Sequence, residues 1–160
     1  MMTRRPDFDN DNNEDVPDPM QQQPDGARRQ GLAAMPPPQL QHELDGEQGS
    51  FILKLRVDLC WEPQHVLTLL KQMYEYIISV ENAAQLNRKT AGELWFVIHF
   101  IQNWSSHEAF RHANPYPDDY YRDVYELLFM LGDWYFTGEC PYTNPGSMLD
   151  EIRSLEQGNG

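Results

Sequence analysis

A chain of 160 residues with a formal net charge of −13 has room for one ordinary domain and a tail. Residues 1–50 carry ten acids and four arginines, and residues 51–160 carry fifteen acids and eight bases, so neither part offers a basic face to phosphates. This balance disfavours direct nucleic-acid binding and favours partners that are other proteins.

The first fifty residues differ in composition from the rest. Phe8 is their single aromatic residue, and prolines and glutamines are frequent among them. Because large apolar side chains are needed to offset the entropy of ordering a backbone, we predict a disordered acidic Pro/Gln-rich arm over 1–50 and a helical interaction domain over 51–157. The arm is either a solubilising leader or a recognition segment in which Phe8, or Leu40 and Leu44 at helical spacing, docks on a partner.

Residues 51–59 alternate apolar and polar side chains, a period of two that predicts a half-buried strand. No obvious second strand is present, although a weakly extended segment near residues 136–142 could pair with it. We expect an intermolecular contact instead, either a homodimer or β-augmentation by a partner. The alternative is that the segment only packs on the domain's own helices. The candidate interaction residues are Phe8, Phe51, Leu53, Lys54, Leu55, Arg56, Val57, Leu59 and Trp61.

Helices are expected over most of the remaining chain. Pro63 fits a helical first turn, and the capping-box pattern from Thr90 to Glu93 predicts the start of a helix that is apolar on every face and therefore central and buried. Further helices are predicted from about 105 to 113, from 118 or 119 to 137, and from 147 to about 155. The expected core residues are Trp95, Ile98, Ile101, Leu128 and Leu131.

The fold class that follows is mainly α: a compact bundle of four or five helices with one N-terminal β-strand, preceded by the disordered arm. Cys60 and Cys140 are expected to be reduced thiols, and we find neither a secretory leader nor an apolar run long enough for a membrane span. We therefore expect a soluble intracellular protein, nuclear or cytoplasmic, without a membrane contact.

The sequence offers little support for chemistry. His107 and His112 lie five residues apart, which places them on different faces of a helix and disfavours a shared metal ion. His99 is expected to be a hydrogen-bonded core histidine. Gly-rich phosphate loops, nucleophile elbows and paired CxxC motifs are lacking. We predict a protein that is not an enzyme and that needs no cofactor and no metal.

Four segments carry a resemblance to a known family. Met73–Ile77, Leu94–Gln102, Glu108–Arg111 and Val124–Leu131 resemble, in order and approximate spacing, the central region of the adenovirus 52/55-kilodalton late protein, over about residues 66–136. This resemblance implies a mostly helical scaffold in viral genome packaging and capsid maturation, with contacts to other packaging proteins and to viral DNA. The present chain is shorter and lacks basic stretches.

The functional prediction is a non-enzymatic scaffold or adaptor for protein–protein contacts, which the resemblance places in viral assembly or genome packaging. The alternative is a regulatory protein that captures a host factor through the acidic arm or the 51–62 edge. Residues 58–62 (DLCWE) are similar to the LxCxE peptide with which several viral proteins bind the retinoblastoma pocket, but Asp58 replaces its leucine. Viral packaging components or a host regulatory factor are thus the expected partners.

Overall fold

A computed structural model describes residues 31–157, and this part of the chain is mainly helical, as expected. It contains seven helices instead of the predicted four or five with a strand. They are α1 (Pro38–Leu44), α2 (Phe51–Val57), α3 (Pro63–Val80), α4 (Arg88–Ser105), α5 (Glu108–Ala113), α6 (Asp118–Thr137) and α7 (Pro145–Gln157).

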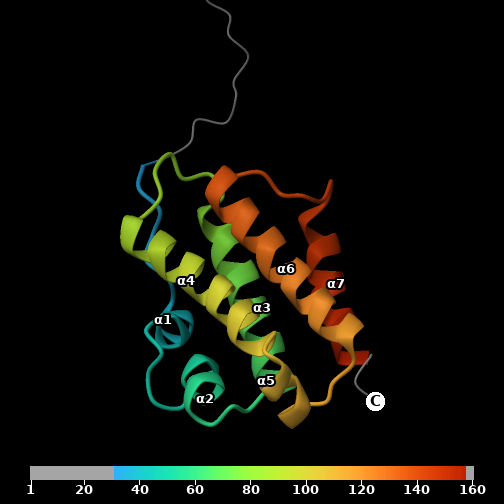
Figure 1. The fold of residues 1–160 in the computed structure, drawn as a ribbon. Coiled ribbons are helices and arrows are strands. Elements are labelled where there is room, and N and C mark those ends of the chain that lie inside the picture. Colours follow the sequence, from blue (N-terminus) through green and yellow to red (C-terminus); the bar gives the residue numbers. More distant parts are fainter. Residues whose placement is uncertain (1–30, 158–160) are drawn as a thin grey trace, which may run out of the picture.

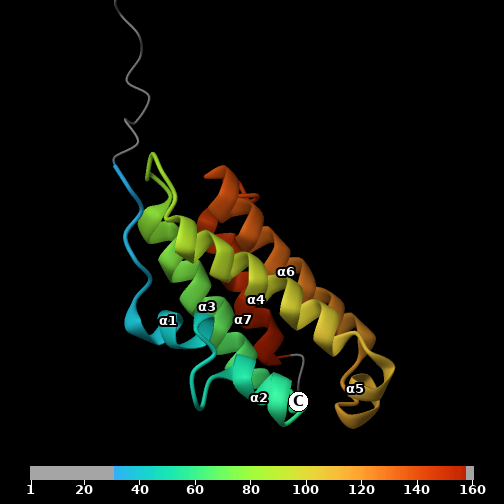
Figure 2. The ribbon, with the colours of Figure 1, turned by 60° about the vertical axis from the view of Figure 1, so that its left-hand side comes forward.

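The four longer helices form two layers (Figures 1 and 2). Helices α4 and α6 pack side by side in front, and α3 and α7 pack side by side behind them. The short helices α1 and α2 pack against one end of α3 and α4. One surface of α4 is therefore left without a covering helix among the described residues.

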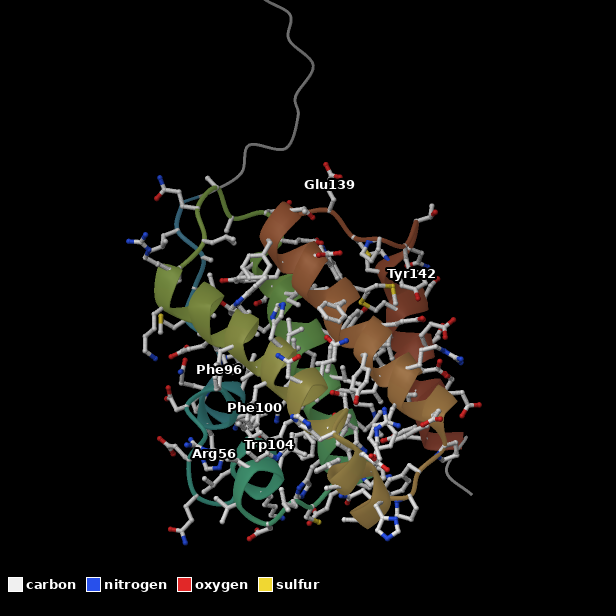
Figure 3. The ribbon with its side chains drawn as sticks, viewed as in Figure 1. Arg56, Phe96, Phe100, Trp104, Glu139 and Tyr142 are labelled. Carbon is white, nitrogen blue, oxygen red and sulfur yellow. The ribbon has the colours of Figure 1, made fainter. Side chains whose placement is uncertain are left out.

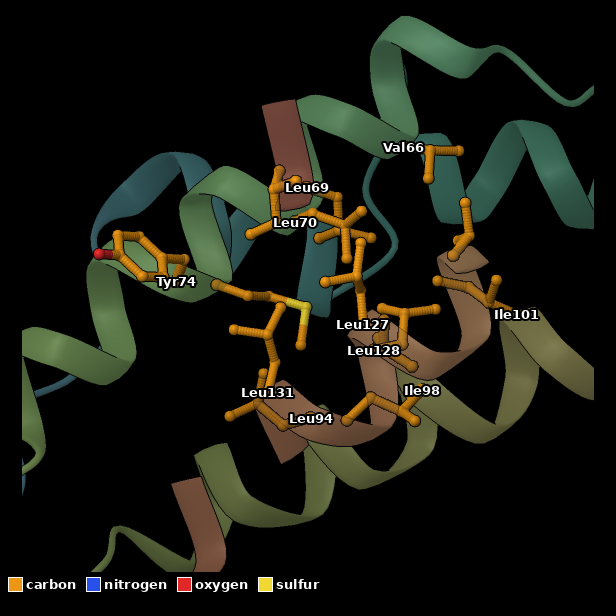
Figure 4. Packing of buried hydrophobic residues seen from close by; sticks show 14 of the residues in the cluster. Val66, Leu69, Leu70, Tyr74, Leu94, Ile98, Ile101, Leu127, Leu128 and Leu131 are labelled. Carbon is orange, nitrogen blue, oxygen red and sulfur yellow. The ribbon is translucent and has the colours of Figure 1, made fainter. Parts of the chain in front are cut away.

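Aliphatic side chains from α3, α4 and α6 meet in the centre of the domain (Figure 4). Their burial is the main source of folding free energy, at about 25 cal/mol for each Å² of apolar surface removed from water. Four of the five predicted core residues, Ile98, Ile101, Leu128 and Leu131, are buried in this cluster.

Residues 51–57 are helical, so the predicted strand is wrong, and with it the expected strand-mediated homodimer or β-augmentation. The Ser50 hydroxyl accepts from the Leu53 N–H at 3.1 Å, and a carboxylate oxygen of Glu43 accepts from the Phe51 N–H at 2.8 Å. Two backbone donors that a helix start leaves unpaired are thus satisfied.

Burial raises the pKa of the Glu43 carboxyl, and the hydrogen bond from the Phe51 N–H acts in the opposite direction and lowers that pKa. The helix also buries Ile52, a residue that the predicted strand would have placed on its polar face.

Residues 31–50 belong to the folded domain, which corrects the predicted boundary of the arm at residue 50. The Ala33 N–H donates to the Gln85 carbonyl at 2.8 Å, and the Tyr76 hydroxyl donates to the Ala34 carbonyl at 2.8 Å. Leu40 and Leu44 of α1 are buried in the core. Residues 1–30 of the predicted arm, Phe8 included, lie outside the described residues.

The predicted helix over 90–101 begins earlier than its capping-box pattern indicated. Asn87 is the cap, since its side-chain oxygen accepts from the N–H groups of Lys89 and Thr90. Thr90 is buried inside the first turn, and Glu93 forms an ion pair with Lys89 across one turn. Gly138 ends α6, as the sequence predicted, and it adopts the left-handed conformation (φ 72°).

Helices α4 and α6 approach closely at Gly132. A Cβ at this position would lie 2.8 Å from Cδ1 of Ile98, so the Ile98 side chain occupies the space that any larger residue needs. Protein interiors pack too densely to accept that overlap without rearrangement. At Gly132 the Ile98 side chain of α4 therefore lies directly against the backbone of α6.

We predict that Leu40→Ala lowers the free energy of unfolding by about 2–5 kcal/mol, because it leaves a cavity under α1. Leu32→Ala is the matched control, since Leu32 is 61% exposed and should change stability by no more than about 0.5 kcal/mol. Urea unfolding measures both variants. If both variants lose equally little unfolding free energy, residues 31–50 do not belong to the folded domain.

The contact at Gly132 predicts a coupled pair of substitutions. Gly132→Ala forces the Ile98 side chain to move, whereas Ile98→Val removes the Cδ1 methyl that the new Cβ would meet. Gly132→Ala should therefore be better tolerated in the Ile98→Val background, with a coupling energy of about 1 kcal/mol in a double-mutant cycle. If the two changes in unfolding free energy simply add, the side chain at position 98 does not contact position 132.

Candidate functional site

Helix α4 carries an exposed set of large apolar side chains. Trp95 and Phe96 are 57% and 55% exposed, so the predictions that α4 is buried on every face and that Trp95 belongs to the core are wrong. Leu94, Val97 and Ile101 occupy the buried side of the same helix. At 100° per residue, the aliphatic side chains point inward and most of the aromatic ones outward.

Three rings form a ladder along α4. Phe96 and Phe100 stack with ring centroids 5.5 Å apart and an interplanar angle of 15°, and Phe100 and Trp104 follow at 5.4 Å and 28°. The spacing of four residues brings each ring onto the next turn. Figure 3 shows this ladder on the side of α4 that faces α1 and α2. The buried indole N–H of Trp104 has no acceptor in the described residues.

The other side of α4 continues onto α6. The His99 ring lies 3.7 Å from the Trp95 ring, centroid to centroid, and its Nδ1 contacts the Trp95 carbonyl oxygen at 2.8 Å. Trp95 meets the edge of Phe136, and His99 meets Phe129. His99 is thus a half-buried surface residue and not the core histidine that we expected.

We call this surface the aromatic face. Its members are Trp95, Phe96, His99, Phe100 and Trp104 of α4 and Phe129 and Phe136 of α6. Residues 94–107 contain no Asp, Glu, Lys or Arg, although the chain as a whole has a net charge of −13. The α4 part of the aromatic face is therefore an uncharged strip on an acidic molecule. Single exposed apolar residues are ordinary, whereas a contiguous group of them makes this surface the candidate functional site.

A small hollow adjoins the ladder between α4 and α2. It has a volume of about 110 Å³, and its wall includes Ile52, Leu53, Phe96 and Phe100. Arg56 stands at its edge and is exposed, with no acidic partner in the described residues. We call this feature the Arg56 hollow.

The candidate residues proposed from the sequence separate into two groups. Phe51, Leu55 and Trp61 are buried, and the indole N–H of Trp61 donates to the Tyr120 hydroxyl at 3.2 Å. Their side chains pack inside the domain and are not available to a partner. Phe8 lies outside the described residues.

The remaining candidates lie at or near the surface. Leu53 and Lys54 are half-buried, and the Lys54 ammonium pairs with the Glu62 carboxylate at 3.3 Å. Arg56, Val57 and Leu59 are exposed. Among the described candidates, this second group alone offers side-chain surface to a partner, and Leu53 and Arg56 also line the Arg56 hollow.

Sequence reasoning missed the aromatic face because it took the run from 94 to 101 as uniformly apolar. A signal was present: aromatic residues recur at 96, 100 and 104, while aliphatic ones recur at 94, 98 and 101. Both series have helical spacing but they differ in phase. The second series faces the core and the first faces out.

In residues 31–157, no three His, Cys, Asp or Glu side chains are grouped so that they could hold a metal ion. The helices in the same range lack the length and apolar character that a membrane-crossing segment needs. Cys60 and Cys140 are free thiols.

Comparisons with protein-family models, curated proteins and solved structures found no match to this chain.

Proposed function

We propose that the chain is a non-enzymatic scaffold or adaptor whose helical domain binds another protein through the aromatic face. The observation that carries this proposal is the exposure of Trp95 and Phe96 on α4, next to a third exposed ring, Phe136, on α6. Tryptophan and other aromatic side chains are enriched at the centres of protein interfaces, because one residue supplies a large apolar area at low entropic cost.

The charge distribution supports contact with a protein surface. The uncharged strip 94–107 lets an apolar partner approach without leaving a buried, unpaired charge behind. The net charge of −13 favours a partner with basic residues at its rim, since opposite charges steer association. The resemblance to the adenovirus packaging scaffold supports virus assembly or genome packaging as the process.

A second function draws support from the 51–62 edge. Val57 and Leu59, at and just after the end of α2, are 66% and 47% exposed. Leu59 has φ = 51°, a conformation that a leucine adopts only when its surroundings impose it. A regulatory protein that captures a host factor would use this edge, or residues 1–30, in place of the aromatic face.

Affinity capture with the full-length chain from cells that produce it separates these functions. Trp95→Ser combined with Phe96→Ser should lower the affinity for the captured partner by roughly 30-fold or more, as expected when interface hot spots worth about 2 kcal/mol are removed. Val57→Ser combined with Leu59→Ser is the matched control, because it also removes two exposed apolar side chains.

Circular dichroism and thermal unfolding verify that both double variants keep their helices. If the Trp95 and Phe96 variant captures the partner as well as the wild type does, the partner does not bind through the aromatic face and the scaffold proposal is contradicted. Loss of capture in the Val57 and Leu59 variant, or on removal of residues 1–30, favours the regulatory protein.

A further inference from the structure

The size of the Arg56 hollow defines what it can accept. Pockets for drug-sized ligands usually measure about 300–1,000 Å³, and this one has only about 110 Å³. Its apolar wall comes from Ile52 and Leu53 on α2, from Phe96 and Phe100 on α4 and from Leu44, and Asp45, Gly46 and Arg56 complete the lining. One inserted side chain, apolar and preferably aromatic, fits that volume and that chemistry.

Charges at the rim indicate what should flank this side chain. Asp45 also borders the hollow, but its carboxylate pairs with the Lys89 ammonium at 3.5 Å. Arg56 is left without an acidic partner in the described residues. An inserted aromatic residue with neighbouring carboxylates would pair with Arg56 on the α2 side, because a guanidinium binds carboxylates in a fork geometry.

We propose that the Arg56 hollow is the docking site of this chain's own segment Asp7-Phe8-Asp9. Phe8 is the single aromatic residue among the first fifty, and an aspartate flanks it on either side. Phe8 would enter the hollow against Phe96 and Phe100, and an aspartate would pair with Arg56. The segment thus supplies both features of the ligand that the hollow requires.

The connecting chain is long enough for this contact. Residues 9–30 separate Phe8 from Gly31, and 22 residues span up to about 70 Å. The described chain begins beside the start of α4, where the Gly31 carbonyl accepts from the N–H groups of Ala84 and Gln85. Phe96 lies only eight residues, or about 12 Å, along α4 from Arg88. A tethered segment also has an effective concentration on the order of millimolar, so a weak contact is sufficient.

Docking would cover the part of the aromatic face nearest to α2. Phe96 and Phe100 would be occupied by Phe8, while Trp95 and Phe136 would stay accessible on the other side of α4. Release of the segment would then precede full engagement of a partner. This consequence rests on the proposed function, but the docking itself does not.

Nuclear magnetic resonance of the uniformly ¹⁵N-labelled full-length chain tests the docking. Phe8→Ala should shift the amide resonances of residues 52–56 and 96–100 and leave those of α7 in place. Arg56→Glu should shift the resonances of residues 7–9. Arg88→Glu is the matched control, because Arg88 is also exposed without an acidic partner in the described residues but does not border the hollow.

Unmoved resonances at 52–56 and 96–100 in the Phe8→Ala chain would overturn the proposal, as would equal shifts of residues 7–9 in the two arginine variants. Shifts that grow with protein concentration would overturn it too, since the occupant would then be a second copy. The Phe8→Ala arm of the test does not involve Arg56, so it stays informative whatever Arg56→Glu does to folding. Partner capture through Trp95 is measured separately, and its failure would leave the docking result untouched.

Discussion

The burial of Leu94, Ile98 and Ile101 in the shared core determines which side of α4 faces solvent. Because Gly132 has no Cβ, the Ile98 side chain lies against the α6 backbone, only 2.8 Å from where a Cβ would be. Leu94 and Ile101 lie on the same side of α4 and are buried with Ile98. Rotating α4 would withdraw these aliphatic side chains from the core, at a cost of about 1.5–3 kcal/mol for each one exposed. The rings of α4 are therefore held in an outward position.

This arrangement gives the acidic chain a surface suited to apolar contact. Trp95 and Phe96 each expose more than half of their surface. Covering roughly 100 Å² on each ring would contribute roughly 2.5 kcal/mol per residue before the costs of association. The absence of formal charges over 94–107 removes the desolvation penalty that an ion pair would bring to the same contact. Under the proposed function, the partner contact would therefore centre on the exposed side of α4.

Much of the helical pattern was predictable from the sequence, because α3 and α6 have regular apolar stripes and Gly138 supplies a clear stop signal. The start of α2 was not predicted, because the alternating apolar pattern outweighed the cap at Ser50. The Glu43 carboxylate, which accepts from the Phe51 N–H, reaches it only through the fold. The aromatic face was missed for a related reason. A sequence shows that Trp95 and Ile98 are apolar, but which of them meets α6 depends on tertiary contacts such as that at Gly132.

The central claim, that α4 presents aromatic side chains to solvent, can be tested through the fluorescence of Trp95. The difference between the wild-type and Trp95→Phe spectra isolates the emission of this residue from that of the three other tryptophans. We expect the difference spectrum to be red-shifted and readily quenched by acrylamide, a neutral quencher that the chain's net charge does not repel. A blue-shifted component that resists quenching would show that Trp95 is buried and that α4 is the central helix of the domain.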